Sequence, residues 1–248
     1  YLNSLMNFPP SGSSISSLYD KFNLNLNTPV NLNFNVTDDL TIDADKKLAQ
    51  RIVMYWYKGD YKDGNEYKTV TIGTQEWMAE NLNVEHYRNG DVIPQVQDKI
   101  EWQNLTTGAW CYYENKELNG KIFGKLYNWY AVNDSRGLAP EGWHIPSDAE
   151  WTQLTDYLGD EAGKKMKNIK RWSNDGNGTN ESGFSGLPGG SRFANGKFFD
   201  INDNGCFWTS SESNNISGIG RYLLYFKSFV SSPNNYKKFG MSVRCVRD

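Results

Sequence analysis

The oxygen-rich segment DINDNG, residues 200–205, is the best candidate for a metal site in this sequence. Asp200, Asn202 and Asn204 occupy positions 1, 3 and 5 of a calcium-loop spacing, and a glycine follows at position 6, where such loops turn sharply. Position 12, which normally holds a bidentate glutamate, is Ser211. The alternative is a tight turn that joins two strands. We therefore expect no cofactor, with calcium as the alternative.

Cysteine and histidine are too sparse to suggest zinc or thiol chemistry. The chain has three cysteines, none in a CxxC pair, and two histidines. Cys206 and Cys245 are followed by Phe207 and Val246, which predicts that both thiols are buried, and a buried thiol is a poor nucleophile. We interpret His144, in the GWHIP segment, as a structural histidine. The sequence therefore favours a protein that is not an enzyme.

Two late segments, SESNNISGIGRYLLYF and KSFVSSPNNYKKF, combine aromatic rings with amides and hydroxyls. Such side chains suit recognition, because a ring covers the apolar face of a sugar or fills a pocket, and an amide both donates and accepts hydrogen bonds. The three tyrosines of this region could equally belong to the core. The candidate ligand-binding residues are Arg192, Asn214, Asn215, Arg221, Tyr222, Tyr225, Lys227 and Tyr236.

Near the start of the chain, residues 22–36 read FNLNLNTPVNLNFNV and alternate between apolar residues and asparagine. This alternation predicts a strand with one apolar face, and Pro29 favours an edge strand or a break. The apolar face must be covered. It either packs against its own domain, which we favour, or adds to the sheet edge of a neighbouring subunit and builds a polymer.

A domain boundary falls near residue 60, where Gly-Asp and Asp-Gly pairs signal turns. The chain is thus divided into a β-rich N-terminal segment, 1–60, and a domain, 61–248. A net charge of −3 predicts no nucleic-acid partner. No apolar stretch reaches the roughly 20 residues of a transmembrane helix. No signal peptide precedes the first segment, so we expect that the signal was removed or that export takes another route.

The clearest element of the domain is a helix that begins after Ser147. The segment SDAE is a capping box, with Ser147 as N-cap and Glu150 reaching back to it. Helical spacing of apolar residues predicts a second helix within 124–134, and QEWMAENLN, residues 75–83, reads as a helical turn. The domain is therefore expected to contain two helices.

Short aromatic strands follow residue 170: GKFFDI, CFWTSSE, GRYLLYF and GMSVRCVRD. In the last of them Met241, Val243 and Cys245 share one face, which we expect to lie in the core, and Ser242 and Arg244 share the other. Together with the helices, these strands predict an α+β fold with a C-terminal antiparallel sheet.

Six blocks of the domain carry a family resemblance. In order they are TVTIGTQEWMAENLNVEHYRNGDVIP, GKLYNWYAVND, APEGWHIPSDAEWTQLTDYLG, GTNESGFSGLPGGSR, FWTSSE and GMSVRCVRD. Over about residues 66–248 the chain resembles the Fibrobacter succinogenes major paralogous domain, which is common in secreted and surface proteins of Bacteroidetes. The resemblance implies a C-type-lectin-like fold of the branch related to the formylglycine-generating enzyme.

The resemblance also bears on chemistry. The EPN, QPD and WND triplets of calcium-dependent lectins are absent from this chain. In related folds the C-terminal stretch carries ligand-facing positions. Because AWCYY and SVRCV belong to the family-like pattern, the resemblance favours a disulfide between Cys111 and Cys245 in an oxidising compartment, with Cys206 as a buried free thiol.

The leading functional hypothesis is a non-enzymatic, secreted or cell-surface protein that binds a glycan or a surface protein. The first alternative is a structural subunit of a surface filament, pilus or virion fibre, assembled through residues 22–36. The second is an oxidase-like enzyme of the formylglycine-generating branch. The expected location is extracellular, at the bacterial outer cell surface, with a virion as the alternative.

Overall fold

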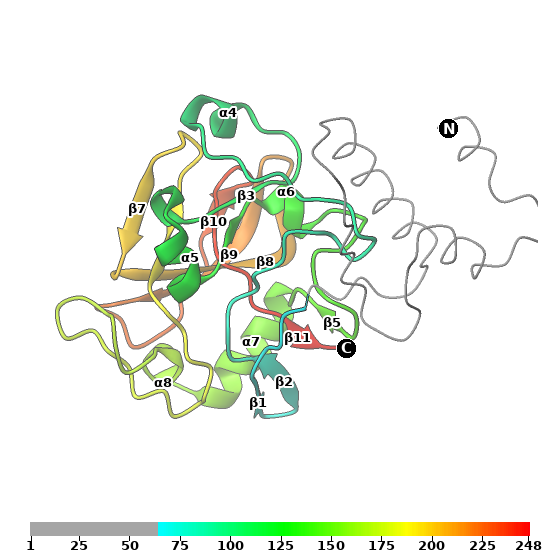
Figure 1. The fold of residues 1–248 in the computed structure, drawn as a ribbon. Helices are drawn as coiled ribbons and strands as arrows, with labels where there is room; N and C mark the ends of the chain where they lie inside the picture. Colours follow the sequence, from blue (N-terminus) through cyan, green and yellow to red (C-terminus); the bar gives the residue numbers. More distant parts are fainter. Residues whose placement is uncertain (1–63) are drawn as a thin grey trace, which may run out of the picture. The chain divides into compact units, whose positions relative to one another are not determined.

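The computed structural model of the chain describes residues 64–248 (Figure 1). The predicted N-terminal segment, 1–60, and its alternating run at 22–36 lie outside the described residues, as does the exact position of the domain boundary. The described part has a mixed α+β fold, as predicted. Its elements in chain order are β1 (Thr69–Ile72), β2 (Gln75–Met78), α4 (Lys99–Asn104), β3 (Trp110–Cys111), the 3-10 helix η1 (Tyr113–Asn115), α5 (Glu117–Phe123), β4 (Leu126–Tyr127), α6 (Trp129–Val132), β5 (Trp143–His144), α7 (Asp148–Leu158), α8 (Ala162–Met166), β6 (Gly189–Arg192), β7 (Phe198–Ile201), β8 (Asn204–Asn214), β9 (Ser217–Leu224), β10 (Asn234–Tyr236) and β11 (Val246–Arg247).

Between residues 64 and 248 the strands form a five-stranded sheet, a four-stranded sheet and a two-stranded pair. The five-stranded sheet has the order β10-β9-β8-β6-β7 and is antiparallel except where β6 and β8 run parallel. The predicted late antiparallel sheet is therefore confirmed, with one parallel contact. The four-stranded sheet has the order β1-β2-β11-β5, so the last strand of the chain lies between two early ones.

Helix α7 begins directly after Ser147, as the sequence predicted. The Ser147 side chain accepts a hydrogen bond from the Glu150 backbone N–H, and the Glu150 carboxylate accepts one from the Ser147 backbone N–H at 2.7 Å. The inner face of the helix is buried through Trp151, Leu154 and Leu158. The capping box and the apolar spacing, both local features, are sufficient to predict where this helix lies in the sequence.

The other two helical predictions are wrong in whole or in part. The segment 124–134 divides into the short strand β4 and the four-residue helix α6, because Asn128 caps a new helix by accepting from the Ala131 backbone N–H. Residues 75–78 form strand β2, not a helical turn. This strand pairs with β1 across a tight turn at Gly73, whose φ of 62° suits glycine. The described residues also contain α4, α5 and α8, so two helices was too few.

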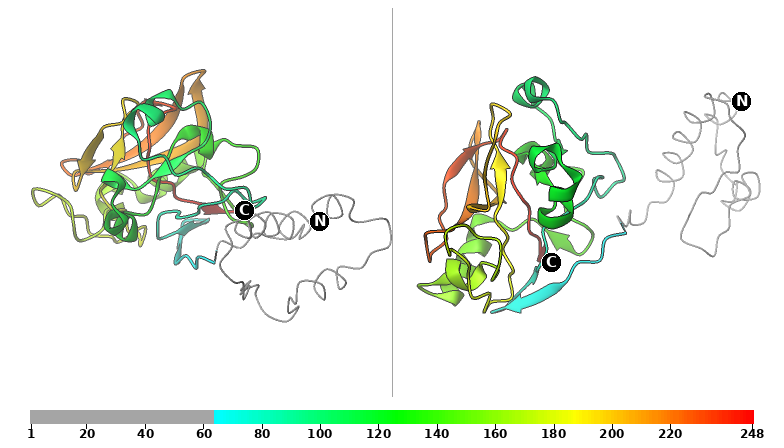
Figure 2. Two further views of the ribbon diagram at one scale, coloured as in Figure 1. Left: turned by 45° about the horizontal axis from the view of Figure 1, so that its top comes forward. Right: turned by 60° about the vertical axis from the view of Figure 1, so that its left-hand side comes forward.

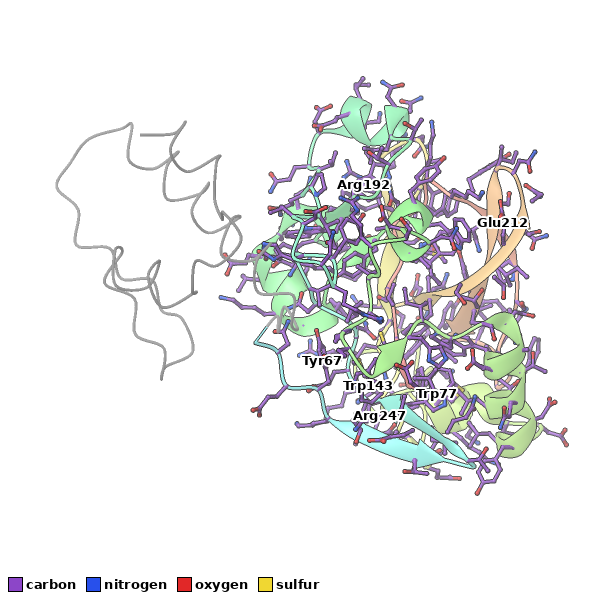
Figure 3. The ribbon with its side chains drawn as sticks, turned by 90° about the vertical axis from the view of Figure 1, so that its right-hand side faces the viewer. Tyr67, Trp77, Trp143, Arg192, Glu212 and Arg247 are labelled. Carbon is purple, nitrogen blue, oxygen red and sulfur yellow. The ribbon has the colours of Figure 1, made fainter. Side chains whose placement is uncertain are left out.

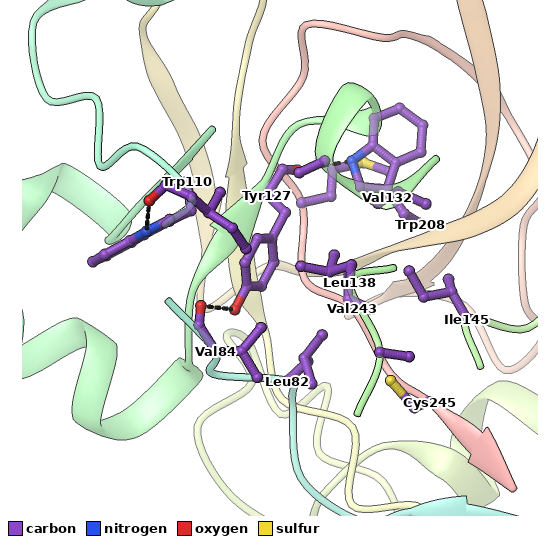
Figure 4. Packing of buried hydrophobic residues seen from close by; sticks show 14 of the residues in the cluster. Leu82, Val84, Trp110, Tyr127, Val132, Leu138, Ile145, Trp208, Val243 and Cys245 are labelled. Atoms are coloured by element: carbon purple, nitrogen blue, oxygen red, sulfur yellow. Dashed lines mark hydrogen bonds between the residues drawn. The ribbon is translucent and has the colours of Figure 1, made fainter. Parts of the chain in front are cut away.

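The largest apolar cluster lies around Tyr127, whose buried hydroxyl donates to the Val84 carbonyl oxygen at 2.7 Å (Figure 4). The indole N–H of Trp110 donates to the Ile93 carbonyl oxygen at 2.9 Å, and that of Trp208 donates to the Tyr127 carbonyl oxygen at 2.9 Å. These three aromatic side chains thus bury their rings and still satisfy their polar atoms.

The C-terminal segment is buried on both faces. Met241, Val243 and Cys245 are fully buried, as predicted. Ser242 and Arg244, on the other face, are buried as well, with exposed fractions of 2% and 0%. The right-hand view of Figure 2 shows the reason, because the red C-terminal segment passes between the orange late strands and the green helices.

Arg244 is held inside the molecule by acceptors on distant segments. Its guanidinium donates to Asn81 Oδ1 at 2.7 Å, to the Met78 carbonyl oxygen at 3.0 Å and to the Phe184 carbonyl oxygen. Burial lowers the pKa of Arg244 to about 9. The side chain therefore remains a cation at neutral pH and ties the last segment to residues far away in the sequence.

Candidate functional site

Two of the predicted ligand-binding residues are not available to a ligand. Arg192 is 1% exposed, and its guanidinium donates to the Val96 carbonyl oxygen at 2.7 Å and lies 4.4 Å from the centre of the Trp102 ring. Arg221 is 6% exposed and forms an ion pair with Asp148 at 2.7 Å. Both arginines brace elements against one another, so their prediction as ligand contacts is corrected.

The remaining candidates divide between the core and the surface. Tyr222 packs against the largest apolar cluster, and its hydroxyl donates to Asn235 Oδ1 at 2.7 Å. Asn214 and Asn215 are exposed at the tip of the β8–β9 hairpin, and Tyr236 is exposed on β10. Tyr225 and Lys227 are half-buried in the loop after β9. The structure therefore brings these residues to separate places, not to one site.

A row of four aromatic rings crosses one end of the five-stranded sheet. Phe199 lies 4.4 Å from Phe193, Phe193 lies 4.6 Å from Phe239, and Phe239 lies 6.2 Å from Tyr236, all measured between ring centres. The two outer rings are exposed, with 38% for Phe199 and 56% for Tyr236, whereas the inner two are half-buried. We call these four residues the aromatic ladder.

Backbone pairing places the inner rings of the ladder side by side. The Arg192 N–H donates to the Gly240 carbonyl oxygen at 2.9 Å, and the Gly240 N–H donates back at 2.7 Å. Because Phe193 and Phe239 flank this pair, their rings stack at an interplanar angle of 16°. A Cβ on Gly240 would lie 2.9 Å from the Trp102 ring, so this approach requires glycine.

Only Tyr236 of the ladder was a candidate from the sequence. Phe193, Phe199 and Phe239 come from different strands and turns, and no spacing in the sequence links them. At the neighbouring hairpin, the Lys237 ammonium pairs with Glu212 at 2.5 Å and lies 4.6 Å from the Trp129 ring centre. Figure 3 shows Glu212 on this hairpin, well away from Trp143 and Arg247.

The predicted calcium segment is the turn between β7 and β8. Asp200 and Asn202 adopt positive φ angles of 68° and 67°, and the Asp203 N–H donates to the Asp200 carbonyl oxygen at 3.1 Å. This is the alternative that the sequence left open. Among residues 64–248, no group of three or more histidine, cysteine, aspartate or glutamate side chains is placed to hold a metal ion.

All three cysteines are buried and no disulfide joins any two of them, so the disulfide implied between Cys111 and Cys245 is corrected. Cys111 belongs to the cluster around Trp102, whereas Cys245 belongs to the cluster around Tyr127. Cys206 is a buried free thiol, as expected. Burial raises the pKa of Cys111 to about 12 and also raises that of Cys206. These thiols are therefore protonated and poorly nucleophilic at neutral pH.

His144 lies between two carboxylates. Its Nδ1 is 2.8 Å from Asp248 Oδ1, and its Nε2 is 2.7 Å from Glu150 Oε1. Burial tends to lower the pKa of His144, but the hydrogen bonds to Glu150 and Asp248 outweigh it and raise the pKa. Both ring nitrogens are engaged, so the imidazole joins the start of α7 to the end of β11, in line with its interpretation as structural.

None of the helices between residues 64 and 248 has the length and apolar character that crossing a bilayer requires. Comparison of the chain with curated proteins finds no match. The sequence model of one family, described as the Fibrobacter succinogenes major domain, matches residues 70–247. This range covers every helix and nearly every strand described above. The chain therefore belongs to the Fibrobacter succinogenes major domain family.

Proposed function

We propose that this protein is a non-enzymatic binding protein that recognises a glycan or a surface protein through the aromatic ladder. The observation that carries the proposal is the ladder itself. Four rings from separate chain segments form one row whose ends, Phe199 and Tyr236, are exposed. Aromatic side chains give large, rigid contact area at low entropic cost, and exposed apolar clusters mark interaction sites.

The surroundings of the ladder support recognition more than catalysis. Asn195 and Lys197 are exposed on the turn that follows Phe193, and they offer hydrogen-bonding groups beside the rings. The three thiols are buried, and the ring nitrogens of His144 are engaged by carboxylates. The thiols that an oxidase-like reaction would use are thus buried, and the partly exposed His144 has both ring nitrogens occupied.

We also propose a fold type and a location for this protein, and binding that does not require calcium. We assign the α+β domain to a C-type-lectin-like fold, on the family membership and the mixed sheet architecture. We place the protein at the outer surface of a bacterial cell, with a virion as the alternative. Binding is expected to proceed without calcium, since the DINDNG segment is a tight turn.

A glycan array tests the ladder directly. The full chain is compared with a Phe199→Ala/Tyr236→Ala variant and with a Tyr157→Ala control, whose ring is 68% exposed on α7. Binding is expected to fall by about tenfold or more in the double variant, because each ring that faces the sugar contributes on the order of 1 kcal/mol to the binding free energy. Binding is expected to persist in the control. The array is repeated with a calcium chelator, which is expected to change nothing.

Equal binding by the full chain and the double variant would remove the ladder from the site. A full chain that binds no glycan is then tested for capture of a purified surface protein with the same three variants. Loss of binding in Tyr157→Ala, with retention in the double variant, would assign recognition to the α7 face.

A further inference from the structure

The loop after β9 presents a cation between two exposed aromatic rings. Phe226 is 65% exposed and Phe229 is 51% exposed. The Lys227 ammonium lies 5.7 Å from the centre of the Phe226 ring and 4.8 Å from that of the Phe229 ring, and it donates to Ser231 Oγ at 3.4 Å. We call these residues, Phe226, Lys227 and Phe229, the basic aromatic loop. The loop therefore places a positive charge beside two apolar rings.

The loop is held in place by a buried lysine beneath it. Lys167 is 3% exposed, and its ammonium donates to the carbonyl oxygens of Leu224, Tyr225 and Lys227 at 3.1, 3.1 and 3.2 Å. The Lys164 backbone N–H donates to the Ser228 carbonyl oxygen at 3.0 Å. The three hydrogen bonds from the Lys167 ammonium fix the backbone of the loop. The rings of Phe226 and Phe229 are therefore attached to a backbone of defined position.

The segment that contains Lys167, residues 164–171, is rich in basic residues. Five of the eight residues at 164–171 are lysine or arginine and none is acidic, although the whole chain has a net charge of −3. Lys167 is buried, so the other four supply the charge at the surface. Of these five, Lys164 pairs with Glu161 at 3.5 Å, while Lys170 and Arg171 have no ion-pair partner between residues 64 and 248. Ile169, in the middle of this stretch, is 55% exposed. The surface therefore combines unpaired positive charge with apolar groups.

We propose that the basic aromatic loop and residues 164–171 bind an acidic polysaccharide built of hexuronate units. A hexuronate bears its carboxylate directly on the pyranose ring, so the anion and the apolar C–H face are only a bond apart. That spacing matches an ammonium within 6 Å of two ring centres. A phospholipid headgroup also carries an anion, but it offers no apolar pyranose face beside the charge for Phe226 and Phe229 to cover.

This site shares no residue with the aromatic ladder. An experiment can therefore refute one of the two proposed binding sites without refuting the other. The probes are sodium polygalacturonate, sodium alginate and fully methyl-esterified galacturonan, which keeps the backbone of the first probe without its charge. Isothermal titration or affinity electrophoresis of the full chain is run at about 50 mM and about 500 mM NaCl, because exposed charge pairs are screened within a few ångströms at high salt. The chain is expected to bind an acidic probe, with about tenfold loss on esterification and a clear loss at high salt.

Two variants and two matched controls locate the contact. Lys227→Gln and Phe226→Ala/Phe229→Ala are each expected to weaken binding of the acidic probe by about fivefold or more. The controls are Lys121→Gln and Leu118→Ala on α5, whose side chains are 67% and 73% exposed and which are expected to bind as the full chain does. A Tyr236→Ala variant is also expected to bind normally, which separates this site from the ladder.

Four results would overturn the proposal: no binding of either acidic probe, equal binding of the esterified probe, unchanged binding in the loop variants, or equal losses in the α5 controls. Vesicles of phosphatidylglycerol are run in parallel by sedimentation. Binding to vesicles without binding to the polysaccharides would replace the proposal with a membrane-facing role for the loop.

Discussion

Several cations of this protein are buried against carbonyl oxygens instead of carboxylates. Arg192 donates to carbonyls of residues 96–98, Arg244 to those of Met78 and Phe184, and Lys167 to those of the loop after β9. A buried charge is costly unless it is hydrogen-bonded, and charge-assisted bonds are stronger than neutral ones. Each of these side chains therefore fastens a segment that carries no regular secondary structure.

Val243 is the simplest test of the core assignment at the residue scale. Val243→Asp is expected to abolish folding, because the carboxylate would be buried without a partner at a fully buried position. Val92→Asp is the matched control, since Val92 is 61% exposed. Circular dichroism melts of both variants decide the matter. A soluble Val243→Asp protein with a cooperative melt would contradict the packing of the C-terminal segment.

The thiols give a second prediction at this scale. Because all three cysteines are buried and no disulfide joins them, the native protein is expected to react with a thiol reagent very slowly, and the unfolded protein is expected to expose three thiols. The measurement is labelling under native conditions and in denaturant, followed by mass spectrometry without reduction. A peptide that joins Cys111 to Cys245 would restore the disulfide that the family resemblance implied.

His144 predicts a dependence of stability on pH. Its pKa is raised in the folded protein by Glu150 and Asp248, so its contribution to the free energy of unfolding is complete below its ordinary pKa of 6.5 and is lost as the pH rises through the raised value. Because His144 is 39% exposed, the contribution is about 0.5 kcal/mol after screening. His144→Gln is therefore expected to lose more stability at about pH 5.5 than at about pH 8.5.

His86 is the matched control for this pH dependence. Burial lowers the pKa of His86, so its protonation opposes folding and His86→Gln is expected to gain relative stability on acidification. Denaturant unfolding of both variants at the two pH values measures the effect. The same pH trend in both variants would mean that the carboxylates around His144 do not control its charge.

At the scale of elements, α7 is the helix that closes the second apolar cluster. Trp151 on its inner face lies 5.1 Å from Trp77, 5.5 Å from Phe184 and 5.6 Å from Phe207, measured between ring centres. The contacts with Trp77 and Phe184 are edge-to-face and that with Phe207 is tilted, and such contacts add to the stabilisation from buried apolar area. The helix therefore depends both on its local cap and on aromatic residues from three other segments.

Ser147→Ala tests the contribution of the cap. Loss of the N-cap hydroxyl is expected to cost about 1 kcal/mol and to lower the melting temperature by about 2–4 °C. The loss is limited because the Asp148 N–H still donates to Ser211 Oγ at 2.9 Å. Ser213→Ala, at an exposed position of β8, is the control. Thermal melts of the two variants that coincide would show that the capping box adds nothing to stability.

At the scale of the molecule, residues 64–248 contain three apolar clusters. The clusters draw their buried members from residues 72–246, with the largest around Tyr127 and the next around Trp151. A fragment of residues 64–248 is therefore expected to be soluble and to melt cooperatively. Thermal melting and size-exclusion chromatography of the fragment and the full chain make the comparison, and an aggregated fragment would contradict the expectation.

The alternating run at 22–36 is tested with the same fragment. If this run adds to a neighbouring subunit, any assembly formed by the full chain is expected to disappear in the fragment, and a synthetic 22–36 peptide is expected to bind the fragment. Internal packing predicts instead a monomeric full chain that is measurably more stable than the fragment. If the full chain is monomeric, is no more stable than the fragment, and the fragment does not bind the peptide, residues 22–36 have neither of these two roles.

The sequence by itself determined the features that depend on near neighbours. The capping box at Ser147 and Glu150 specifies a helix within a few residues, and the alternation of Met241, Val243 and Cys245 specifies an inward face. The ordered blocks also identified the family. Each of these signals lies within one segment, where backbone geometry alone fixes which side chains share a face.

Tertiary structure decided everything that depends on segments meeting. The sequence predicted that Arg192 and Arg221 contact a ligand at the surface. In the structure, carbonyl oxygens enclose Arg192 and the Asp148 carboxylate pairs with Arg221, all from distant segments. Ser242 and Arg244 are buried because helices cover one side of the C-terminal segment and strands cover the other. The aromatic ladder exists because the Arg192–Gly240 backbone pair brings together rings more than 40 residues apart, and sequence spacing carries no information about that pairing.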